Sequence, residues 1–322
     1  MLRQRFGLRR IAKNNILVLL AVAIVLFVAF SALSRSFLSA YNLRTFLINL
    51  SYFVIVVTGE TLLMISGNLD FSIGGVIALT SVVVARLYEL GINIFLAILC
   101  GLMVGLVTGV VNGWTVVKMK LNSIIVTLGT SAITEGLALV ITSALTIAIF
   151  EDTLGFIGRG AIVHVPVPVI LMVIVVAAAA VVLHRTKSGF RIYATGANRR
   201  AAFISGIHTD RLQFVLYVVC GLGASLAGLV ITSLSAVGMP GHGVGQEIGV
   251  ITAVIMGGVP LTGGKGSVIG TLLGMLIIQL IYNGLTQLNV IPYYIQIIQG
   301  LLLIAIVTAY VRSENLLGSE RS

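Results

Sequence analysis

Long apolar runs separated by short polar connections make up most of the chain. A helix needs about 20 mostly apolar residues to cross the hydrocarbon core of a bilayer. The run at 248–259 is short for a straight crossing, and the run at 123–148 is long enough to tilt or break. The pattern predicts an all-α polytopic helix bundle, a single transmembrane domain over residues 1–322, with ten spans at 15–33, 46–66, 73–90, 94–114, 123–148, 166–183, 212–235, 248–259, 267–286 and 292–311.

The positive charges sort to one side of this bundle. If the N-terminus is cytoplasmic, sixteen of the twenty Lys and Arg residues fall in cytoplasmic segments. The four that remain outside are Arg35, Arg44, Arg86 and Arg159. Cytoplasmic loops of membrane proteins carry such an excess of basic residues, so we predict that both termini are cytoplasmic. A cleaved signal peptide is the alternative for the first span, but 15–33 is long for one and no cleavage site follows cleanly.

Composition excludes a water-soluble globule. The chain is 58% hydrophobic and 9% charged, and its mean hydropathy is +1.12. A soluble domain carries about 25% charged residues. The net charge of +10 would also suit a nucleic-acid-binding protein, but no soluble basic domain is present to hold nucleic acid. We therefore expect membrane lipid, and no nucleic acid, around the chain, with Cys100 and Cys220 as buried apolar residues.

Glycines recur every four residues in two spans. Such a repeat lines one face of a helix with small residues and favours close helix packing. The alternative interpretation is that these faces slide past one another during transport. The sequence does not decide between static packing and sliding. The two sets are Gly101, Gly105, Gly109 and Gly113, and Gly266, Gly270 and Gly274.

The longest predicted cytoplasmic connection runs over about 184–211 and is basic. Asn198 is a good N-cap, 199–204 can form a short helix, and Gly206 can end it. With Ala201 and Ala202 this helix would present a shallow surface suited to a groove on another protein. Binding of the loop to anionic lipid head groups is an equal alternative.

Polar and flexible residues interrupt the apolar pattern at 66–75. Asp70 either caps the following helix by accepting from backbone N–H groups near 72–74, which we favour, or lines a cavity. Glu60 and Glu135 lie inside predicted spans, so each is expected to face the interior of the bundle.

A glycine-rich segment at 257–267 resembles a phosphate-binding loop but lacks its spacing. Val259 stands where the first glycine is needed, and Gly266 where Ser or Thr must follow Lys265. We expect a hinge or re-entrant turn instead, formed with Gly257, Gly258, Gly263 and Gly264.

Catalytic motifs are not recognisable. The four histidines are dispersed, and neither a zinc-protease motif nor a nucleophile elbow occurs. We expect a non-catalytic protein without metal or cofactor.

Four motifs in order resemble the permease subunits of ABC sugar importers of the ribose, xylose and arabinose class. They are 67–74, similar to Gly-Gly-Ile-Asp-Leu-Ser-Val-Gly; the Thr-Leu-Gly-Thr run at 127–130; the Tyr-Ala-x-Gly-x-Asn loop at 193–207; and the glycine segment at 257–271. Asn68 replaces a usual glycine, and Ser123 and Ile124 replace a common Pro-Phe pair, and these departures leave room for a solute other than ribose.

The resemblance implies a bacterial inner-membrane permease that moves a monosaccharide or a similar polyol or nucleoside-like solute by alternating access. Its implied partners are an ABC ATPase subunit, a second permease copy or paralogue, and a periplasmic sugar-binding protein. Residues implied in ATPase coupling are Gly189, Tyr193, Gly196, Asn198, Ala201, Ala202 and Gly206. Candidate pathway residues are Asn68, Asp70, Ser72, Asn112, Thr127, Thr130 and Asn283. A secondary carrier driven by an ion gradient through Glu60 or Glu135 is the alternative.

Overall fold

The computed structural model describes the backbone of residues 2–319 and the side chains of residues 16–291, 293–305 and 308. The chain is an all-α polytopic membrane protein with very short strands. Its long helices are α1 (Leu2–Leu33), α2 (Ala40–Ile65), α3 (Ile73–Glu89), α4 (Ile94–Gly113), α5 (Ser123–Thr142), α7 (Val167–Arg185), α10 (Thr209–Ser235), α12 (Val268–Gln287) and α13 (Pro292–Ser319). The shorter helices are α6 (Asp152–Arg159), α8 (Lys187–Ala197), α9 (Arg199–Ile204) and α11 (Gln246–Met256), and a π-helical turn, Trp114–Lys118, follows α4.

Each of the ten predicted spans contains one helix, but the helices differ in length. Within the described residues, seven of them are long and apolar enough to cross a membrane; these lie in α1, α2, α4 with its π-helical turn, α5, α7, α10 and α12. Of the remaining three, α3 has 17 residues and α11 has 11. The basic residues predicted near the two termini, among them Arg3 and Arg321, lie outside the residues whose side chains are described.

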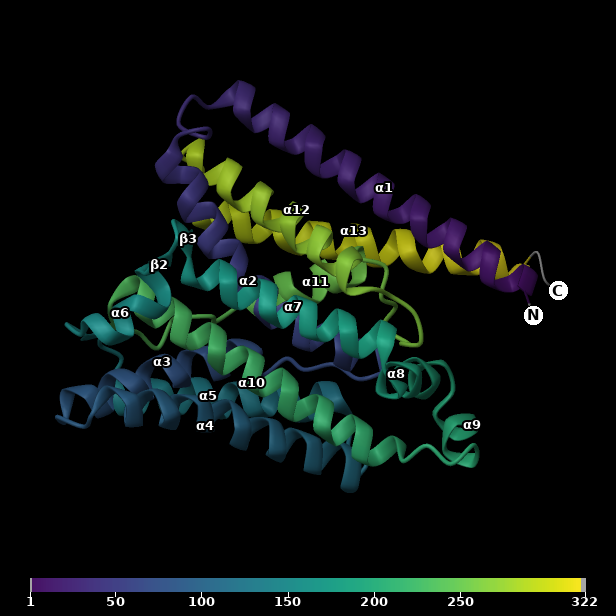
Figure 1. Ribbon diagram of the computed structural model, residues 1–322, viewed down its shortest axis with the longest axis horizontal. Helices are drawn as coiled ribbons and strands as arrows, with labels where there is room; N and C mark the ends of the chain where they lie inside the picture. The colour runs from purple at the N-terminus through teal and green to yellow at the C-terminus, as the bar shows by residue number, and fades with distance from the viewer. Residues whose placement is uncertain (1, 320–322) are drawn as a thin grey trace.

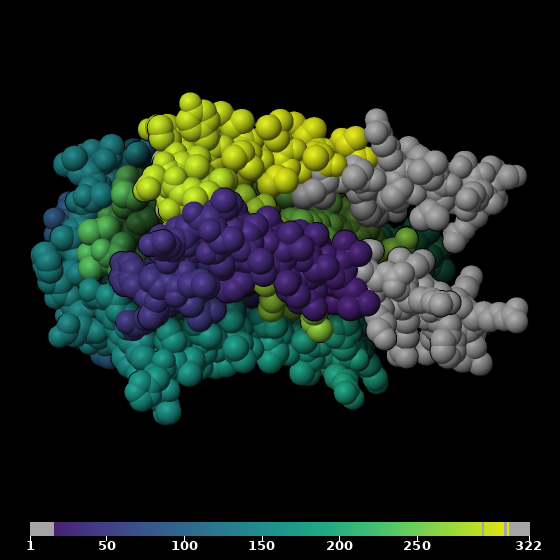
Figure 2. Space-filling view, turned by 90° about the horizontal axis from the view of Figure 1, so that it is seen from above, coloured from purple at the N-terminus to yellow at the C-terminus, as the bar shows by residue number. Residues whose placement is uncertain are grey.

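The α2 helix occupies the middle of the bundle. It contacts α10, α7, α12 and α11, and most of its side chains are buried. On one side of it α3, α4 and α5 pack together with α10, and on the other side α1 packs on α12 (Figure 1). Figure 2 shows the part of α1 that follows residue 15 (purple) in the middle of one face, between the yellow segment near the C-terminal end of the chain and the teal segment that contains α7. The short helices α8 and α9 project from one end of the bundle (Figure 1).

The predicted glycine faces form close helix contacts. A methyl group on Gly105 would lie 2.1 Å from the Gly221 carbonyl oxygen of α10, and one on Gly274 would lie 2.2 Å from the Ala253 carbonyl oxygen of α11. Only glycine allows backbones to approach this closely. The packing interpretation is therefore confirmed for the first repeat and for Gly270 and Gly274 of the second, whereas Gly266 precedes α12 with a φ of +129° and is not part of its face.

The predicted span at 123–148 ends early. Its helix stops at Thr142 because Ser143 and Ala144 adopt left-handed conformations, with φ of 52° and 61°. The chain then forms strand β1 (Ile147–Ala148), which pairs with β4 (Val237–Gly238). Helix α6 and a small hairpin of β2 (Ala161–Ile162) and β3 (Val165–Pro166) complete this end of the bundle, and the sequence pattern predicted neither.

An irregular segment precedes the short helix α11 and runs beside α3. Gly238 packs against Ala85 and Ser81, and Gly243 packs against Ile77, one helical turn further along. His242 Nδ1 and the Ser81 hydroxyl are 2.9 Å apart. The irregular stretch from β4 to Gly243 thus runs along α3 to the start of that helix, and α11 then continues against α2, α12 and α13, which explains why the apolar run at 248–259 is short.

Candidate functional site

The connection between α2 and α3 is a buried break in the helical backbone. Helix α2 ends at Ile65, and Gly67 turns the chain with a φ of +92°. The Ser66 hydroxyl donates to the Leu63 carbonyl oxygen at 2.7 Å, and Gln213 of α10 donates its amide to the Ser66 carbonyl oxygen at 3.0 Å. Side chains from neighbouring helices therefore satisfy backbone groups that the break leaves free.

Two buried carboxylates hold this break. Glu60 is fully buried and Asp70 is 1% exposed. The Asp70 backbone N–H donates to Glu60 Oε1 at 3.1 Å, and the Cys220 thiol donates to Glu60 Oε2 at 3.3 Å. Asp70 Oδ1 accepts from the Ser72 N–H at 2.8 Å and from the Ser72 hydroxyl at 2.5 Å. The predicted contact of Asp70 with backbone N–H groups near 72–74 is confirmed at Ser72.

Helices α4 and α5 extend this cluster. The Asn112 amide donates to the Ser72 hydroxyl at 2.9 Å and to Asp70 at 3.4 Å, and the Thr130 hydroxyl donates to Asn112 Oδ1 at 2.7 Å. Thr127 accepts from the Phe71 backbone N–H at 3.0 Å. We call Glu60, Asp70, Ser72, Asn112, Thr127 and Thr130 the α2–α3 cluster. Its members come from the three helices α2, α4 and α5 and from the connection between α2 and α3, so it ties the break to the bundle.

The other candidate polar residues lie apart from the centre of this cluster. Asn68 is half-buried at the break, and its amide nitrogen has no hydrogen-bond partner among the described residues. Glu135 is half-buried and accepts from Ser131 at 2.8 Å, whereas Glu60 faces the interior as predicted. Asn283 lies far from the cluster and bonds to Asn42 of α2.

The glycine segment 257–267 packs against the same break from the side of α8. The Gly264 N–H donates to the Ile65 carbonyl oxygen, the last of α2, at 2.8 Å. Gly258, Gly263 and Gly264 have φ of +91°, +79° and +79°, where side chains are strained. Gly257 has an ordinary φ but faces α12, since a methyl group there would lie 2.5 Å from Thr271 Cα.

Helix α8 is attached to this glycine segment. A methyl group on Gly196 would lie 1.9 Å from the Ile65 carbonyl oxygen and 2.4 Å from the Gly264 nitrogen. The Tyr193 hydroxyl donates to the Gly266 carbonyl oxygen at 2.8 Å. Burial raises the pKa of the Tyr193 phenol, so it stays protonated and able to donate. At the start of α8, Gly189 fits against the Leu183 carbonyl oxygen at the corner with α7.

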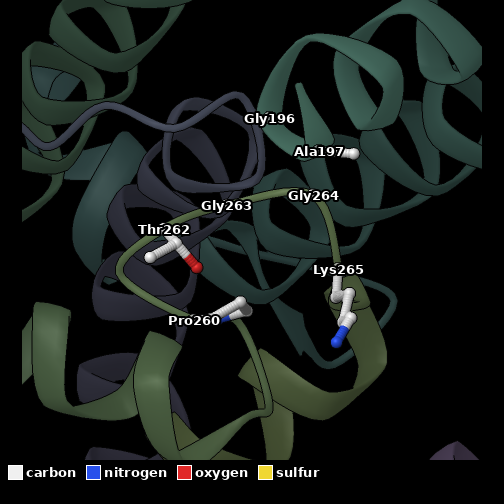
Figure 3. Close-up of a pocket in the computed structure, with 7 residues that line it drawn as sticks. All are labelled: Gly196, Ala197, Pro260, Thr262, Gly263, Gly264 and Lys265. Atoms are coloured by element: carbon white, nitrogen blue, oxygen red, sulfur yellow. The ribbon is translucent and has the colours of Figure 1, made fainter. Parts of the chain in front are cut away.

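A cavity of about 270 Å³ lies where the end of α8 meets the glycine segment. Figure 3 shows Gly263 and Gly264 passing the end of α8 at Gly196 and Ala197, with Lys265 where the segment turns towards α12. Three motifs that are far apart in the sequence therefore meet here: the end of α2, helix α8 and residues 257–267.

The predicted short helix is present as α9. Asn198 Oδ1 caps it by accepting from the Ala201 N–H at 2.9 Å, and Gly206 follows its end with a φ of +83°. Ala201 and Gly206 are exposed, but Ala202 is only 4% exposed. The expectation that Ala202 forms part of an outer surface is therefore wrong, because this face of α9 packs on the chain itself.

Sequence reasoning missed helix α8 and the apolar side chains exposed on both short helices. Phe190 of α8 is 71% exposed, and Phe203 and Ile204 of α9 are 65% and 77% exposed. Thr186, which caps α8 by accepting from the Gly189 N–H at 3.3 Å, was the available signal for that helix.

Comparison with known proteins identifies the class of membrane protein. Residues 42–307 match the family described as branched-chain amino acid transport system, permease component. The chain is 36% identical to the ribose import permease protein RbsC of Bacillus subtilis, over 87% of this chain and 88% of that protein. It is 35% identical to the D-allose transport system permease protein AlsC of Escherichia coli, over 90% of this chain and 88% of that protein.

A third relative is more divergent. The L-arabinose ABC transporter permease protein AraH of Azospirillum brasilense is 29% identical over 97% of this chain and 92% of that protein. No solved structure matches the chain significantly. The family match covers all spans from α2 to α12, and the relatives align over nearly their full length. The chain therefore belongs to the transport-system permease family that is described as branched-chain amino acid transport system, permease component.

Proposed function

We propose that the chain is the membrane permease subunit of an ATP-driven ABC importer that moves a monosaccharide, or a polyol or nucleoside-like solute of similar size, into the cytoplasm by alternating access. The observation that carries this proposal is the full-length similarity to permeases named for ribose, allose and arabinose. The family description names another solute class, but the relatives at 35–36% identity are sugar permeases. ATP hydrolysis then belongs to a separate subunit.

The proposed topology has ten crossings in one domain, with both termini and residues 184–211 in the cytoplasm of a bacterial inner membrane. The distribution of Lys and Arg supports it. Helix α3 would be about 25 Å long at 1.5 Å per residue, so it nearly spans the hydrocarbon core. Helix α11 would cross together with the irregular segment that precedes it along α3, an arrangement tolerated where the backbone is buried in protein.

In this proposal, α8 and α9 dock on the ATPase subunit. Their exposed residues Phe190, Phe203 and Ile204 would fill a groove on that partner, with Ala201 and Gly206 beside them. Four other members of the predicted coupling set have another role. Gly189, Tyr193 and Gly196 attach α8 to the bundle, and Asn198 fixes the start of α9.

Movement of the ATPase subunits would reach the membrane through the contact between α8 and the end of α2. Helix α8 touches Ile65 and the glycine segment directly. Gly257, Gly258, Gly263 and Gly264 are proposed to let this segment follow α8 while α11 and α12 change their tilt. The α2–α3 cluster lies next to the same break, and its burial supports a role in holding the wall of the pathway. Asn68 and Asn283 are proposed to face the solute.

The remaining partners follow from the same proposal. A second permease, identical or paralogous, would pair with this chain around a central pathway, and a periplasmic sugar-binding protein would deliver the solute. The apolar faces of α1, α4, α5 and α7 would contact lipid or the second permease.

The docking proposal is tested by Phe203→Glu in the host, followed by purification of the tagged permease. We expect the variant to reach the membrane in normal amount but to lose its nucleotide-binding partner and its uptake of labelled ribose, allose or arabinose. Phe150→Glu is the matched control, since Phe150 is 87% exposed in the connection between α5 and α6, away from α9. Retention of the ATPase partner by Phe203→Glu would show that α9 is not the docking helix.

A further inference from the structure

A second cavity lies at the end of the bundle opposite α8 and α9, between the start of α2 and the end of α12 (Figure 1). Its volume is about 140 Å³. Five of its ten lining residues are carboxamides, three are aromatic and two are threonines, so none carries a charge. The carboxamides are Asn42, Asn49, Gln279, Asn283 and Gln287.

The lining residues form one polar face on each of two membrane helices. On α2 they recur at Tyr41, Thr45 and Asn49, and on α12 at Gln279 and Asn283, in steps of four residues. Asn49 is nine residues from the start of α2, a distance of about 13 Å at 1.5 Å per residue. Asn49 and Gln279 lie within the predicted spans at 46–66 and 267–286, so the polar face extends into the membrane-spanning part of both helices.

Three of the carboxamides saturate one another at the outer end of the cavity. Asn42 donates to Asn283 Oδ1 at 3.1 Å, and Asn283 donates back to Asn42 Oδ1 at 2.9 Å. Gln287 donates to the same Asn42 oxygen at 2.6 Å and accepts from the Ser36 hydroxyl at 2.7 Å. These hydrogen bonds provide partners for the carboxamides at the rim of the cavity. They also tie the α1–α2 connection to α12.

The two deeper carboxamides, Asn49 and Gln279, do not take part in these hydrogen bonds. Gln279 is only 5% exposed, yet neither its side chain nor that of Asn49 bonds to another residue in the part of the chain that the structure describes. Both side chains border the cavity, so a molecule inside it can supply their hydrogen bonds.

The lining defines the chemistry of that molecule. Each carboxamide offers both a donor and an acceptor, the pairing that a hydroxyl group requires. The rings of Phe46 and Tyr282 provide flat apolar surfaces that fit the C–H face of a sugar ring. An ion would find no opposite charge. We propose that Asn49, Gln279 and the neighbouring rings form a contact site for the neutral polyhydroxylated solute at the outer mouth of the pathway.

This inference rests on the proposed function and assigns its substrate to particular residues. The volume is below the roughly 300–1,000 Å³ of pockets that enclose drug-sized ligands. One chain would hold a small solute on one side only, and such partial contact suits a transporter, which must release what it binds.

The test uses a cysteine at the deep end of the cavity in membrane vesicles from the host. We expect a membrane-impermeant maleimide to label Gln279→Cys from outside, and saturating D-ribose, D-allose or L-arabinose, whichever the vesicles import, to slow that labelling at least threefold. Asn49→Cys provides a second position if Gln279→Cys is not inserted. Leu90→Cys, at the exposed end of α3, is the control that sugar should not protect. The unaltered chain, with Cys100 and Cys220, gives the background.

Unchanged labelling of both cavity variants, in vesicles that import the same sugar, would overturn the contact site and leave the proposed function intact. If the unaltered protein imported none of the three sugars, the proposed function would fail and this inference with it.

Discussion

Gly196 of helix α8 lies directly against the carbonyl group of Ile65, the last residue of α2, with no room for a single added carbon atom. The same carbonyl oxygen accepts from the Gly264 N–H. Three backbone segments, from α8, α2 and the glycine segment, therefore meet without side chains between them. Backbone contacts of this kind do not yield as flexible side chains do, so we expect a displacement of α8 to be transmitted to the end of α2.

The first prediction concerns this contact. Gly196→Ala would place a carbon atom 1.9 Å from the Ile65 oxygen, so α8 must shift away from the bundle. Overpacking typically costs about 1–3 kcal/mol. We expect normal insertion but at least about a tenfold loss of uptake, the equivalent of 1.4 kcal/mol in an equilibrium constant. Uptake per inserted chain is the measurement. Gly136→Ala, which meets no atom within 4 Å, should behave as the unaltered chain.

The second prediction separates a structural role of Asp70 from contact with the solute. Asp70→Ala removes the acceptor for the Ser72 N–H and hydroxyl and for Asn112. Leaving such buried groups unpaired costs about 1–3 kcal/mol. We expect a lower melting temperature in detergent and less protein in the membrane, with an unchanged order of preference among sugars. A changed preference at normal stability would instead indicate that Asp70 contacts the solute.

Sequence periodicity predicted the features that depend on local pattern. Gly105 and Gly109 share a face because four residues make about one helical turn, and the structure packs both against α10. Asn198, residues 199–204 and Gly206 carried a complete set of start and stop signals, and α9 has those bounds. Asp70 lay close enough in sequence to Ser72 for their bond to be expected.

Features that depend on tertiary contacts were not predictable in the same way. Helix α8 has only 11 residues and mixed polarity, so hydrophobic length gave no indication of it. The burial of Ala202 depends on how α9 sits on the chain, which spacing does not reveal. Asn42 and Gln279 lie 237 positions apart in the chain, and only the packing of α2 on α12 brings both to one cavity.

The third prediction tests the glycine face between α4 and α10. Gly105→Ala would place a methyl group 2.1 Å from the Gly221 oxygen and 2.5 Å from the Ser225 hydroxyl oxygen. Since both helices are rigid, they must separate, and we expect a loss of about 1–3 kcal/mol of stability, seen as a lower melting temperature in detergent. Gly129→Ala on α5 has open space around it and should be neutral. Equal stability of the two variants would mean that α4 and α10 do not pack as described.

The fourth prediction distinguishes an ATP-driven permease from a carrier that moves protons through Glu60. Glu60 accepts from the Asp70 N–H and from the Cys220 thiol, and a glutamine keeps one oxygen for the Asp70 N–H. If Glu60 only supports the break after α2, Glu60→Gln should import sugar within about threefold of the unaltered chain, a difference below 1 kcal/mol. Glu60→Leu leaves the Asp70 N–H without an acceptor and should reduce the amount of folded protein.

The matching measurement uses right-side-out vesicles loaded with ATP, with and without a protonophore. Import by an ATP-driven permease continues when the proton gradient collapses, and it stops when ATP is omitted. A carrier that uses Glu60 as its proton site shows the opposite pattern, and Glu60→Gln abolishes its transport because an amide does not bind and release protons in this range of pH. The two mechanisms predict opposite results both for transport by Glu60→Gln and for the energy source of import. If both measurements favour the same mechanism, the role of Glu60 is assigned.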